Sequence, residues 1–255
     1  MLVLAIGDVI GKPGRQAVKK LLPGLRQEYG ISLVIANAEN IAGGIGLTSA
    51  TARELLESGV DVLTSGNHVW ANKEILPYLE GEMPILRPLN YPPGVPGRGY
   101  LIKGQAMVVN LIGRTFMGNY DCPFRTMDKL LLEVGGKSKV IIVDFHAEAT
   151  SEKVALGRYL DGRVSAVLGT HTHVGTIDTQ ILPSGTAYVT DIGMTGPIDS
   201  IIGDDSDSVL SRFLTLIPNR LSVGKGRTML NGVLVRIDEG SGRAVSIERI
   251  YREVD

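Results

Sequence analysis

The segment Val164-Ser165-Ala166-Val167-Leu168-Gly169-Thr170-His171-Thr172-His173 joins a strand-like apolar run to a His-x-His pair. In an extended segment, His171 and His173 would point to the same side, and in a tight turn they would diverge. Both imidazoles could reach neighbouring metal ions in either conformation. A single His-x-His is a weak signal, so its meaning depends on the rest of the chain.

The same arrangement, an apolar run followed by a polar side chain with metal-binding capacity, recurs upstream. The chain has only four histidines, and each stands at or next to the end of such a run. Because loops after the carboxyl ends of parallel strands converge on one edge of a sheet, we expect these side chains to meet. Carboxylate, amide and imidazole groups suit Mn, Fe or Zn, so the pattern predicts a dinuclear metal centre. The candidates are Asp8, Glu39, Asn40, Asn67, His68, His146, His171 and His173.

The remaining pattern predicts an α/β fold in a single domain, residues 1–255. Most strand-like runs are continuously apolar, which is typical of parallel strands covered on both faces by helices. Turn residues at 183–185 and 239–242 predict two hairpins, and therefore a mixed sheet, near the C-terminus. Pro84–Gly99 reads as irregular connection. The predicted strands are 2–6, 33–36, 60–63, 107–112, 140–145, 164–168, 177–182, 187–190, 228–237 and 244–251, and the predicted helices are 12–29, 48–58, 73–79, 128–134 and 151–160.

Bulk composition narrows the function classes. The formal net charge of −1 implies no bulk attraction to nucleic acid or to an anionic membrane, although it leaves a local basic groove open. No apolar run approaches the ~20 residues that span a bilayer, and the N-terminus lacks the basic region of a signal peptide. We therefore expect a cytoplasmic protein. Cys122 stands alone, so no intrachain disulfide can form, and we expect a small buried hydrophobe there.

Simpler structural roles compete at individual positions. Taken alone, Asp8 reads better as a helix cap, Asn40 and Asn67 as turn residues, and His146 as a core histidine. Glu39 is harder to dismiss, because an acid directly after a buried strand needs a partner. If all of these structural roles held, the positions of all four histidines after apolar runs would be a coincidence. We therefore prefer the metal hypothesis.

Three further segments could invite functional interpretations. Gly43–Gly46 lacks the Gly-Lys-Ser/Thr ending of a phosphate loop and is interpreted as a flexible wall of the metal pocket. Gly203–Asp207 is read as a solvated helix start, because it lacks the ligand spacing of a calcium loop. Residues 114–125 carry three aromatics that either cover the site and stack a base or tuck a surface loop onto the core.

The combined motifs resemble a known family. Gly66-Asn67-His68 and Gly169–His173 are similar to the signature of the calcineurin-like metallophosphoesterases. The chain departs from that signature in three places, and these departures resemble the YmdB-like phosphodiesterases. There is no histidine two residues after Asp8, Glu39-Asn40 stands in place of Gly-Asp, and Val69 stands in place of an acid. The matching segments are Gly7–Gly14, Ala38–Gly46, Gly66–His68 and Thr170–His173, and the resemblance spans nearly the whole chain.

This resemblance implies a fold and a set of roles. The fold would be a four-layer α/β/β/α sandwich of two mixed sheets flanked by helices. Glu39 would bridge two metal ions, and His68 would act as general acid without binding metal. The first ion would be held by Asp8, Glu39, Asn40 and His173, and the second by Glu39, Asn67, His146 and His171.

The resemblance also implies an activity, which is a dinuclear metal-dependent phosphodiesterase. Hydroxide on the metals would attack cyclic nucleotides, 2′,3′-cyclic or 3′,5′-cyclic, with RNA as a further candidate substrate. Family precedent favours iron, with manganese or zinc as alternatives, and we expect a homo-oligomer. The competing hypotheses are a phosphomonoesterase or protein phosphatase, and a regulatory protein that senses a nucleotide or RNA without hydrolysing it.

Overall fold

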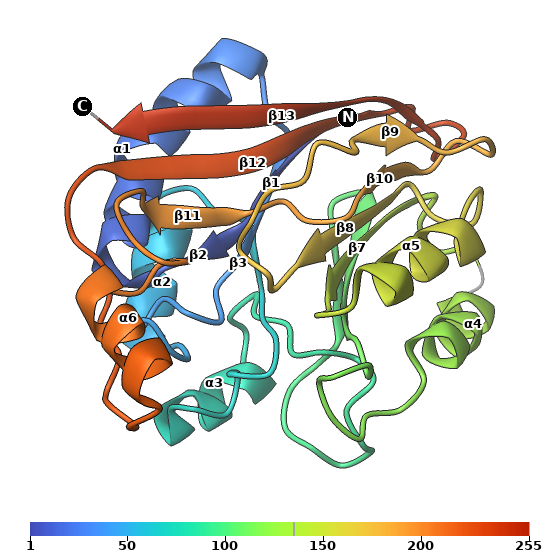
Figure 1. Cartoon of the computed structure of the whole chain (residues 1–255). Coiled ribbons are helices and arrows are strands. Elements are labelled where there is room, and N and C mark those ends of the chain that lie inside the picture. The colour runs from blue at the N-terminus through green and yellow to red at the C-terminus, as the bar shows by residue number, and fades with distance from the viewer. Residues whose placement is uncertain (135, 255) are drawn as a thin grey trace.

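The computed structural model describes residues 1–134 and 136–254, and they form two mixed β-sheets packed between two layers of helices (Figure 1). The prediction of a four-layer α/β/β/α sandwich is confirmed. In the described residues the first sheet has seven strands, and its order is β2-β11-β12-β1-β3-β4 with β13 pairing β12. The second has six, in the order β5-β6-β7-β8-β10-β9.

The strands that lead to the predicted site residues are parallel within each sheet. In the first sheet β1 (Leu2–Ile6), β3 (Leu33–Asn37) and β4 (Val62–Thr64) run parallel. In the second, β6 (Ala106–Ile112), β7 (Val140–His146), β8 (Ala166–Thr170) and β10 (Ala187–Val189) do so. The other strands are β2 (Asp8–Val9), β5 (Tyr100–Lys103), β9 (Gln180–Ile181), β11 (Met194–Pro197), β12 (Thr228–Ile237) and β13 (Ala244–Val254).

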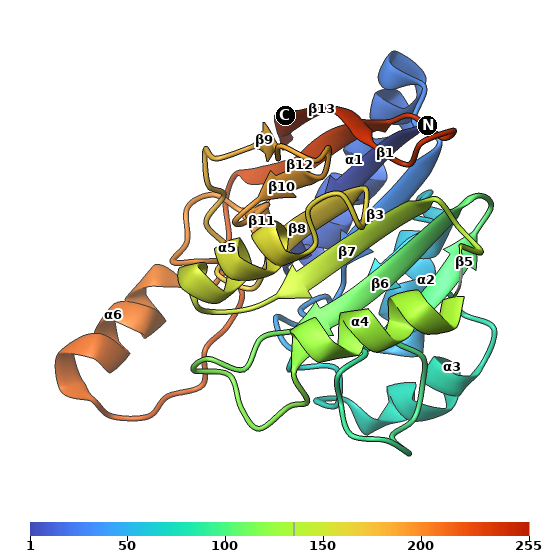
Figure 2. The ribbon, with the colours of Figure 1, turned by 90° about the vertical axis from the view of Figure 1, so that its right-hand side faces the viewer.

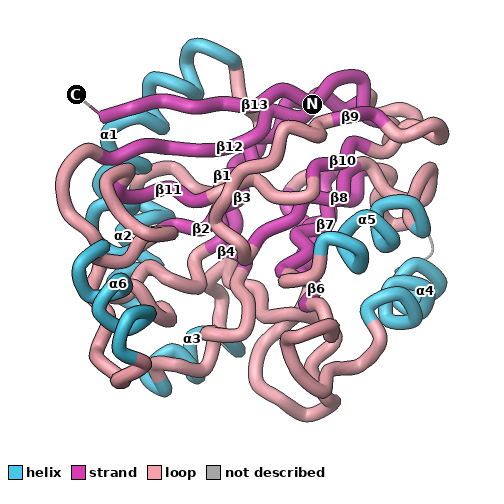
Figure 3. The backbone as a smooth tube through the Cα atoms, in the orientation of Figure 1, coloured by secondary structure: helices cyan, strands magenta, loops and turns pink. Residues whose placement is uncertain are grey.

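Helices cover the outer face of each sheet (Figures 2 and 3). In the first apolar cluster Val18 and Leu22 of α1 (Gly11–Tyr29) and Leu55 of α2 (Ser49–Glu57) pack on the first sheet. In another, Leu130 of α4 (Pro123–Val134) and Leu156 of α5 (Thr150–Tyr159) pack on the second. The remaining helices are the 3₁₀ turn Lys73–Ile75, α3 (Leu76–Glu80) and α6 (Ser206–Thr215).

Local sequence explains where several of these helices begin and end. Thr48 caps α2 with its hydroxyl and forms a reciprocal capping box with Thr51, as expected for a hydroxyl residue before a helix. Asp205 caps α6, which confirms that the acidic segment is a helix start. Gly30 ends α1 in the left-handed conformation, at φ 66°, which glycine adopts without steric cost.

The layer between the two sheets changes from apolar to polar as the strands approach their carboxyl ends. The deeper part is an apolar core that includes Ile35 and Ile142. Two residues further along each strand, these positions become Asn37 and Asp144, and β7 then ends at His146. Each strand is buried throughout, so this gradient delivers polar groups to the rim of a dry interior.

Several local predictions differ from the structure. The expected strand 177–182 is reduced to Gln180–Ile181, although its antiparallel pairing with β10 confirms the hairpin. The short strands β2, β5 and β11 were not predicted. In β11, Met-Thr-Gly-Pro carries no strand pattern and becomes a strand by pairing with β12 and β2. Cys122 is half-buried, not fully buried.

Residues 114–125 are only partly a loop, since α4 begins at Pro123. Tyr120 packs edge-on against Tyr91, with ring centroids 5.1 Å apart, and Phe124 packs against Tyr159 at 5.3 Å. Phe116 is 87% exposed. Two of the three aromatics therefore tie this segment to the body, and one faces solvent.

Candidate metal centre

The structure brings all eight predicted residues together at the carboxyl edge of the parallel strands. Asp8 begins β2, directly after β1, and His146 is the last residue of β7. Glu39 with Asn40, and Asn67 with His68, lie in turns that follow β3 and β4. His171 and His173 lie in the bend after β8. The two sheets thus contribute to one site from opposite sides.

One group of donor atoms surrounds Nε2 of His146. This nitrogen lies 3.0 Å from Glu39 Oε1, 3.2 Å from Asn67 Oδ1 and 3.0 Å from Nδ1 of His171. Ligand atoms of Glu39, His146 and His171 all fall within 4.8 Å of one another. Such a group of one carboxylate and two imidazoles has the spacing and the donor types of a metal site.

A second group surrounds Nε2 of His173. This nitrogen lies 3.8 Å from Asp8 Oδ1 and 3.3 Å from Nδ2 of Asn40. Asn40 Nδ2 in turn lies 3.4 Å from Glu39 Oε1, so Glu39 is adjacent to both groups. His171 and His173 therefore diverge, each toward a different group, as the tight-turn alternative predicted; both have positive φ, 100° and 65°.

The three imidazoles each have one ring nitrogen engaged by an acceptor outside the site. His146 Nδ1 lies 3.0 Å from the Thr170 hydroxyl, which gives its only proton to Asp144 Oδ1 and must accept one from the ring. His173 Nδ1 donates to the backbone carbonyl of Ile202 at 2.7 Å. Nε2 of His171 lies 3.1 Å from the Glu148 carboxylate.

This arrangement turns the other ring nitrogen of each imidazole toward the two donor groups. Metal-ligating histidines are typically held in this way, with the second ring nitrogen donating to a carboxylate, carbonyl or hydroxyl. The inward nitrogens of His146 and His171 are 3.0 Å apart, so without a metal ion one of them must carry a proton that the other accepts. A cation between these donors would take the place of that proton.

Charge and burial support the same conclusion. Asp8 is fully buried, and its Oδ1 has no hydrogen-bond partner among the described residues. Burial raises the pKa of Asp8 to about 6. An orphaned carboxylate oxygen in a dry pocket is costly unless a proton or a metal ion neutralises it.

The imidazoles and Glu39 shift one another strongly. Burial alone would lower the pKa of His146, but the Glu39 carboxylate raises it to about 9. Burial would raise the pKa of Glu39, yet His146 lowers it to about 2. Burial and the positive charge of His146 lower the pKa of His171 to about 3. A proton on His146 thus stands where a cation would neutralise the same carboxylate.

His68 lies at the edge of the site, and its contacts differ from those of the other histidines. Its Nδ1 is 2.9 Å from Asn40 Oδ1 and 3.7 Å from Glu39 Oε1, and its side chain is 36% exposed. Asn40 therefore orients His68, although the residue that follows this histidine, Val69, has no polar group to do so. In this conformation the Asn40 oxygen faces His68, so a ligand role for that oxygen requires its amide to rotate.

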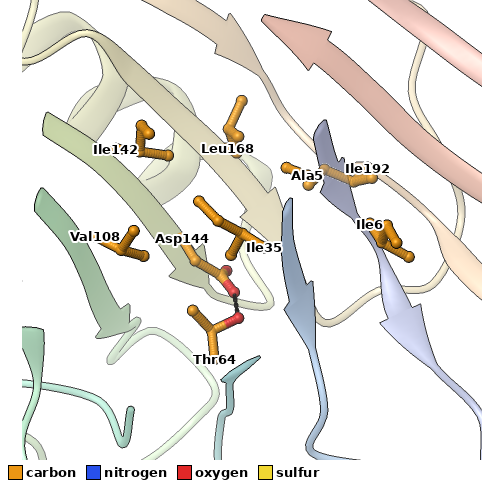
Figure 4. Close-up of a pocket in the computed structure, with 9 residues that line it drawn as sticks. All are labelled: Ala5, Ile6, Ile35, Thr64, Val108, Ile142, Asp144, Leu168 and Ile192. Atoms are coloured by element: carbon orange, nitrogen blue, oxygen red, sulfur yellow. Dashed lines mark hydrogen bonds between the residues drawn. The ribbon is translucent and has the colours of Figure 1, made fainter. Parts of the chain in front are cut away.

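A polar layer that sequence reasoning missed lies next to His146, and Figure 4 shows two of its members, Asp144 and Thr64, joined by a hydrogen bond. Asp144 accepts hydrogen bonds from Thr64, from Thr170 at 2.6 Å and from Asn37 at 3.2 Å. Burial raises the pKa of Asp144, although these hydrogen bonds oppose the shift. The carboxylate borders a small, mostly apolar cavity of about 10 Å³ between the sheets. An acid two residues before His146, inside an apolar run, was the available sequence signal.

Two other residues of the site carry only a weak signal in the sequence. Glu148, which contacts His171, lies after the end of β7, where an exposed acid has no distinctive pattern. Gly66 is required sterically, because a Cβ there would lie 2.2 Å from the His146 ring and 2.4 Å from Glu39 Oε2. The motif Gly66-Asn67-His68 contains this glycine, but the contacts that require it are with Glu39, after β3, and with His146, at the end of β7.

Comparison with known proteins identifies the family of this chain. The family described as YmdB-like protein matches residues 4–250. The chain belongs to the YmdB-like family. It is 49% identical to the 2′,3′-cyclic-nucleotide 2′-phosphodiesterase of Bacillus subtilis, over 98% of this chain and 96% of that protein.

Solved structures share the fold of this chain. A hypothetical protein of Thermus thermophilus superimposes with a TM-score of 0.93 at 48% identity, covering 99% of each chain. A phosphatase of Mycoplasma pneumoniae has the same TM-score at 34% identity, covering 99% of this chain and 93% of its own. The calcineurin-like phosphoesterase YfkN of Bacillus subtilis, at 11% identity and a TM-score of 0.60, shares the fold, covering 98% of this chain and 90% of its own.

The expected family is therefore confirmed, and with it the prediction of an enzyme of the phosphoesterase class. In the described part of the chain, no helix combines the length and the apolar character needed to cross a bilayer.

Proposed function

We propose that this protein is a metal-dependent phosphodiesterase that hydrolyses 2′,3′-cyclic nucleotides, with 3′,5′-cyclic nucleotides as secondary substrates. The observation that carries the proposal is the set of three imidazoles, each held from outside, whose inward nitrogens lie beside the carboxylates of Glu39 and Asp8. The substrate follows from the Bacillus subtilis relative, whose name gives 2′,3′-cyclic nucleotides.

Two metal ions would occupy the two donor groups. Asp8, Glu39, Asn40 and His173 would hold the first, with the Asn40 amide rotated, and Glu39 would bridge to the second. Asn67, His146 and His171 would complete the second. Iron is our first choice, and the mixed oxygen and nitrogen donors also suit manganese or zinc.

Metal ions in these positions supply charge neutralisation for the phosphoryl oxygens and lower the pKa of water. His68 would donate a proton to the leaving oxygen, since it stands beside the donor groups and an imidazole can act as a general acid. In hydrolysis, the oxygen of one water would bond to phosphorus as the bond from phosphorus to the 2′ oxygen breaks. His68 would protonate the 2′ oxygen, and the proton lost by the water would restore His68 through solvent.

The proposal also covers the domain organisation, the location and the assembly of the protein. Residues 1–255 would form one domain, because both sheets share the apolar core between them. We also propose a cytoplasmic location and a homo-oligomer, neither of which enters the argument about the site.

The decisive experiment is a substrate panel with protein loaded anaerobically with iron, manganese or zinc. We expect turnover of adenosine 2′,3′-cyclic phosphate and of bis-p-nitrophenyl phosphate, with much weaker turnover of p-nitrophenyl phosphate. A strong preference for the monoester would favour a phosphomonoesterase or protein phosphatase. Tight nucleotide binding by metal-loaded protein without hydrolysis would favour a sensing protein.

A further inference from the structure

An open cleft of about 940 Å³ extends outward from His68. One wall is the start of α1 with the glycine-rich residues 43–45, and the other is the end of α6 with the segment that follows it. Figures 1 and 2 show α6 standing out from the body of the molecule, so this second wall is built by a projecting element. The volume lies near the upper end of the range for small-molecule sites, roughly 300–1,000 Å³.

Positive charge dominates this cleft. Its lining includes Lys12, Arg212, Arg220 and Lys225, against the single carboxylate of Asp204. Within residues 1–134 and 136–254 none of the four cations forms an ion pair. Because the formal net charge of the whole chain is −1, these cations represent a local concentration of charge, not a general basicity.

The charge exceeds what a cyclic mononucleotide requires. Such a substrate carries one negative charge, on the phosphate that the proposed metal ions neutralise. Four additional unpaired cations leading away from His68 would find no partner on it. A single-stranded nucleic acid carries a further phosphate with every nucleotide, and basic grooves are the usual means of binding it.

We infer that the cleft binds a short oligonucleotide chain, so that the preferred substrate is an RNA end bearing a 2′,3′-cyclic phosphate. The cyclic end would lie at His68, and the preceding phosphates would lie along the cations. Asn219 and Ser222 offer hydrogen-bonding groups in the same wall, and Ile45 and Leu221 offer apolar contact for bases or sugars. This inference rests on the proposed function.

The experiment compares kcat/KM for adenosine 2′,3′-cyclic phosphate, its 5′-phosphorylated form, and a tetranucleotide with a 2′,3′-cyclic end. We expect the tetranucleotide to be preferred by wild-type protein. The variant Arg220→Ala/Lys225→Ala should lose at least tenfold more on the tetranucleotide than on the cyclic mononucleotide. For the tetranucleotide, the slope of log kcat/KM against log salt concentration should be less steep than in wild type by about 1.4, as expected for the loss of two phosphate contacts on a single strand.

The matched control is Lys19→Ala/Lys103→Ala, which removes two exposed lysines that do not line the cleft. It should behave as wild type on all three substrates. Equal losses on the tetranucleotide and the mononucleotide in Arg220→Ala/Lys225→Ala would overturn the inference. The inference would also be overturned if the 5′-phosphorylated mononucleotide had the same kcat/KM as the tetranucleotide, because one additional phosphate would then account for the whole preference.

Failure of the proposed function can be separated from failure of this inference. Absence of hydrolysis of every cyclic substrate would refute the former. Binding of a fluorescent tetranucleotide, measured by anisotropy with wild type and both double variants, would then test the cleft independently. Binding that is unaffected by Arg220→Ala/Lys225→Ala would refute the inference that the cleft binds an oligonucleotide.

Discussion

Lys153 Nζ lies 2.7 Å from Asp191 Oδ2, and the two side chains are 2% and 0% exposed. The same carboxylate accepts hydrogen bonds from the backbone and the hydroxyl of Thr172, the residue between the two site histidines, and from the backbone of Gly193. The buried pair thus fixes the bend in which His171 and His173 adopt positive φ and diverge toward different donor groups.

Removing one member of this pair should be costly. We expect Lys153→Met to lower the free energy of unfolding by about 3–5 kcal/mol, because Asp191 would remain buried without its countercharge. Urea unfolding measures the change. Lys129→Met is the control, since it breaks an exposed pair with Glu133 and should cost less than about 1 kcal/mol. Similar costs for the two variants would contradict the role given to the buried pair.

Thr170→Val should weaken metal binding, although Thr170 is not itself a proposed metal ligand. The substitution keeps the shape of the side chain but removes the acceptor for His146 Nδ1. We expect metal affinity to fall by about 10–100-fold, measured by competition with a chromophoric chelator. Thr186→Val is a matched control, because its hydroxyl bonds only to backbone groups of Leu160, Val164 and Gly162. The role of Thr170 is refuted if both variants lose affinity equally.

His68→Ala separates proton donation from metal binding. We expect kcat to fall by roughly two to four orders of magnitude, as for loss of a general acid, while metal content stays at the wild-type level. Turnover of a cyclic nucleotide and elemental analysis of the same preparation provide the two measurements. Loss of metal in this variant would make His68 a ligand.

Gly66→Ala should disrupt the site directly. Its Cβ would overlap the His146 ring and Glu39, which approach to 2.2 and 2.4 Å, so both ligands must move. We expect loss of high-affinity metal binding, measured by calorimetry. Gly24→Ala, in α1 where a Cβ meets nothing within 4 Å, should instead stabilise the protein by about 0.5–1 kcal/mol. Normal metal affinity in Gly66→Ala would show that the ligands tolerate displacement.

Asp178 predicts a pH dependence outside the metal centre. Burial raises its pKa, but hydrogen bonds from Thr176 and Thr190 outweigh this effect and hold the pKa below the ordinary value of 3.8. A lowered pKa contributes stability that is fully present above 3.8 and lost as the pH falls through the folded-state value. The difference in unfolding free energy between wild type and Asp178→Asn should therefore shrink below about pH 4. A difference that grows on acidification would exclude this explanation.

The amino-acid sequence by itself determined the α/β class and the positions of the eight polar candidates. A continuous apolar run such as Val140–Val143 favours a strand that is buried on both faces, and polar residues that follow such a run are expected at the edge of the sheet. Both statements depend on nearest neighbours in the chain, so they can be made without coordinates. The short strand β11 escaped this reasoning because its pairing, not its residues, makes it a strand.

The tertiary structure alone decided how the candidates work together. Which nitrogen of each imidazole faces inward depends on Thr170 for His146, Ile202 for His173 and Glu148 for His171. The bend between the two histidines depends on Asp191 and Lys153, and the cleft beside His68 depends on the segment after α6. Ring tautomers, buried ion pairs and concentrations of charge arise from groups distant in sequence, and only the packing of the two sheets brings those groups within contact.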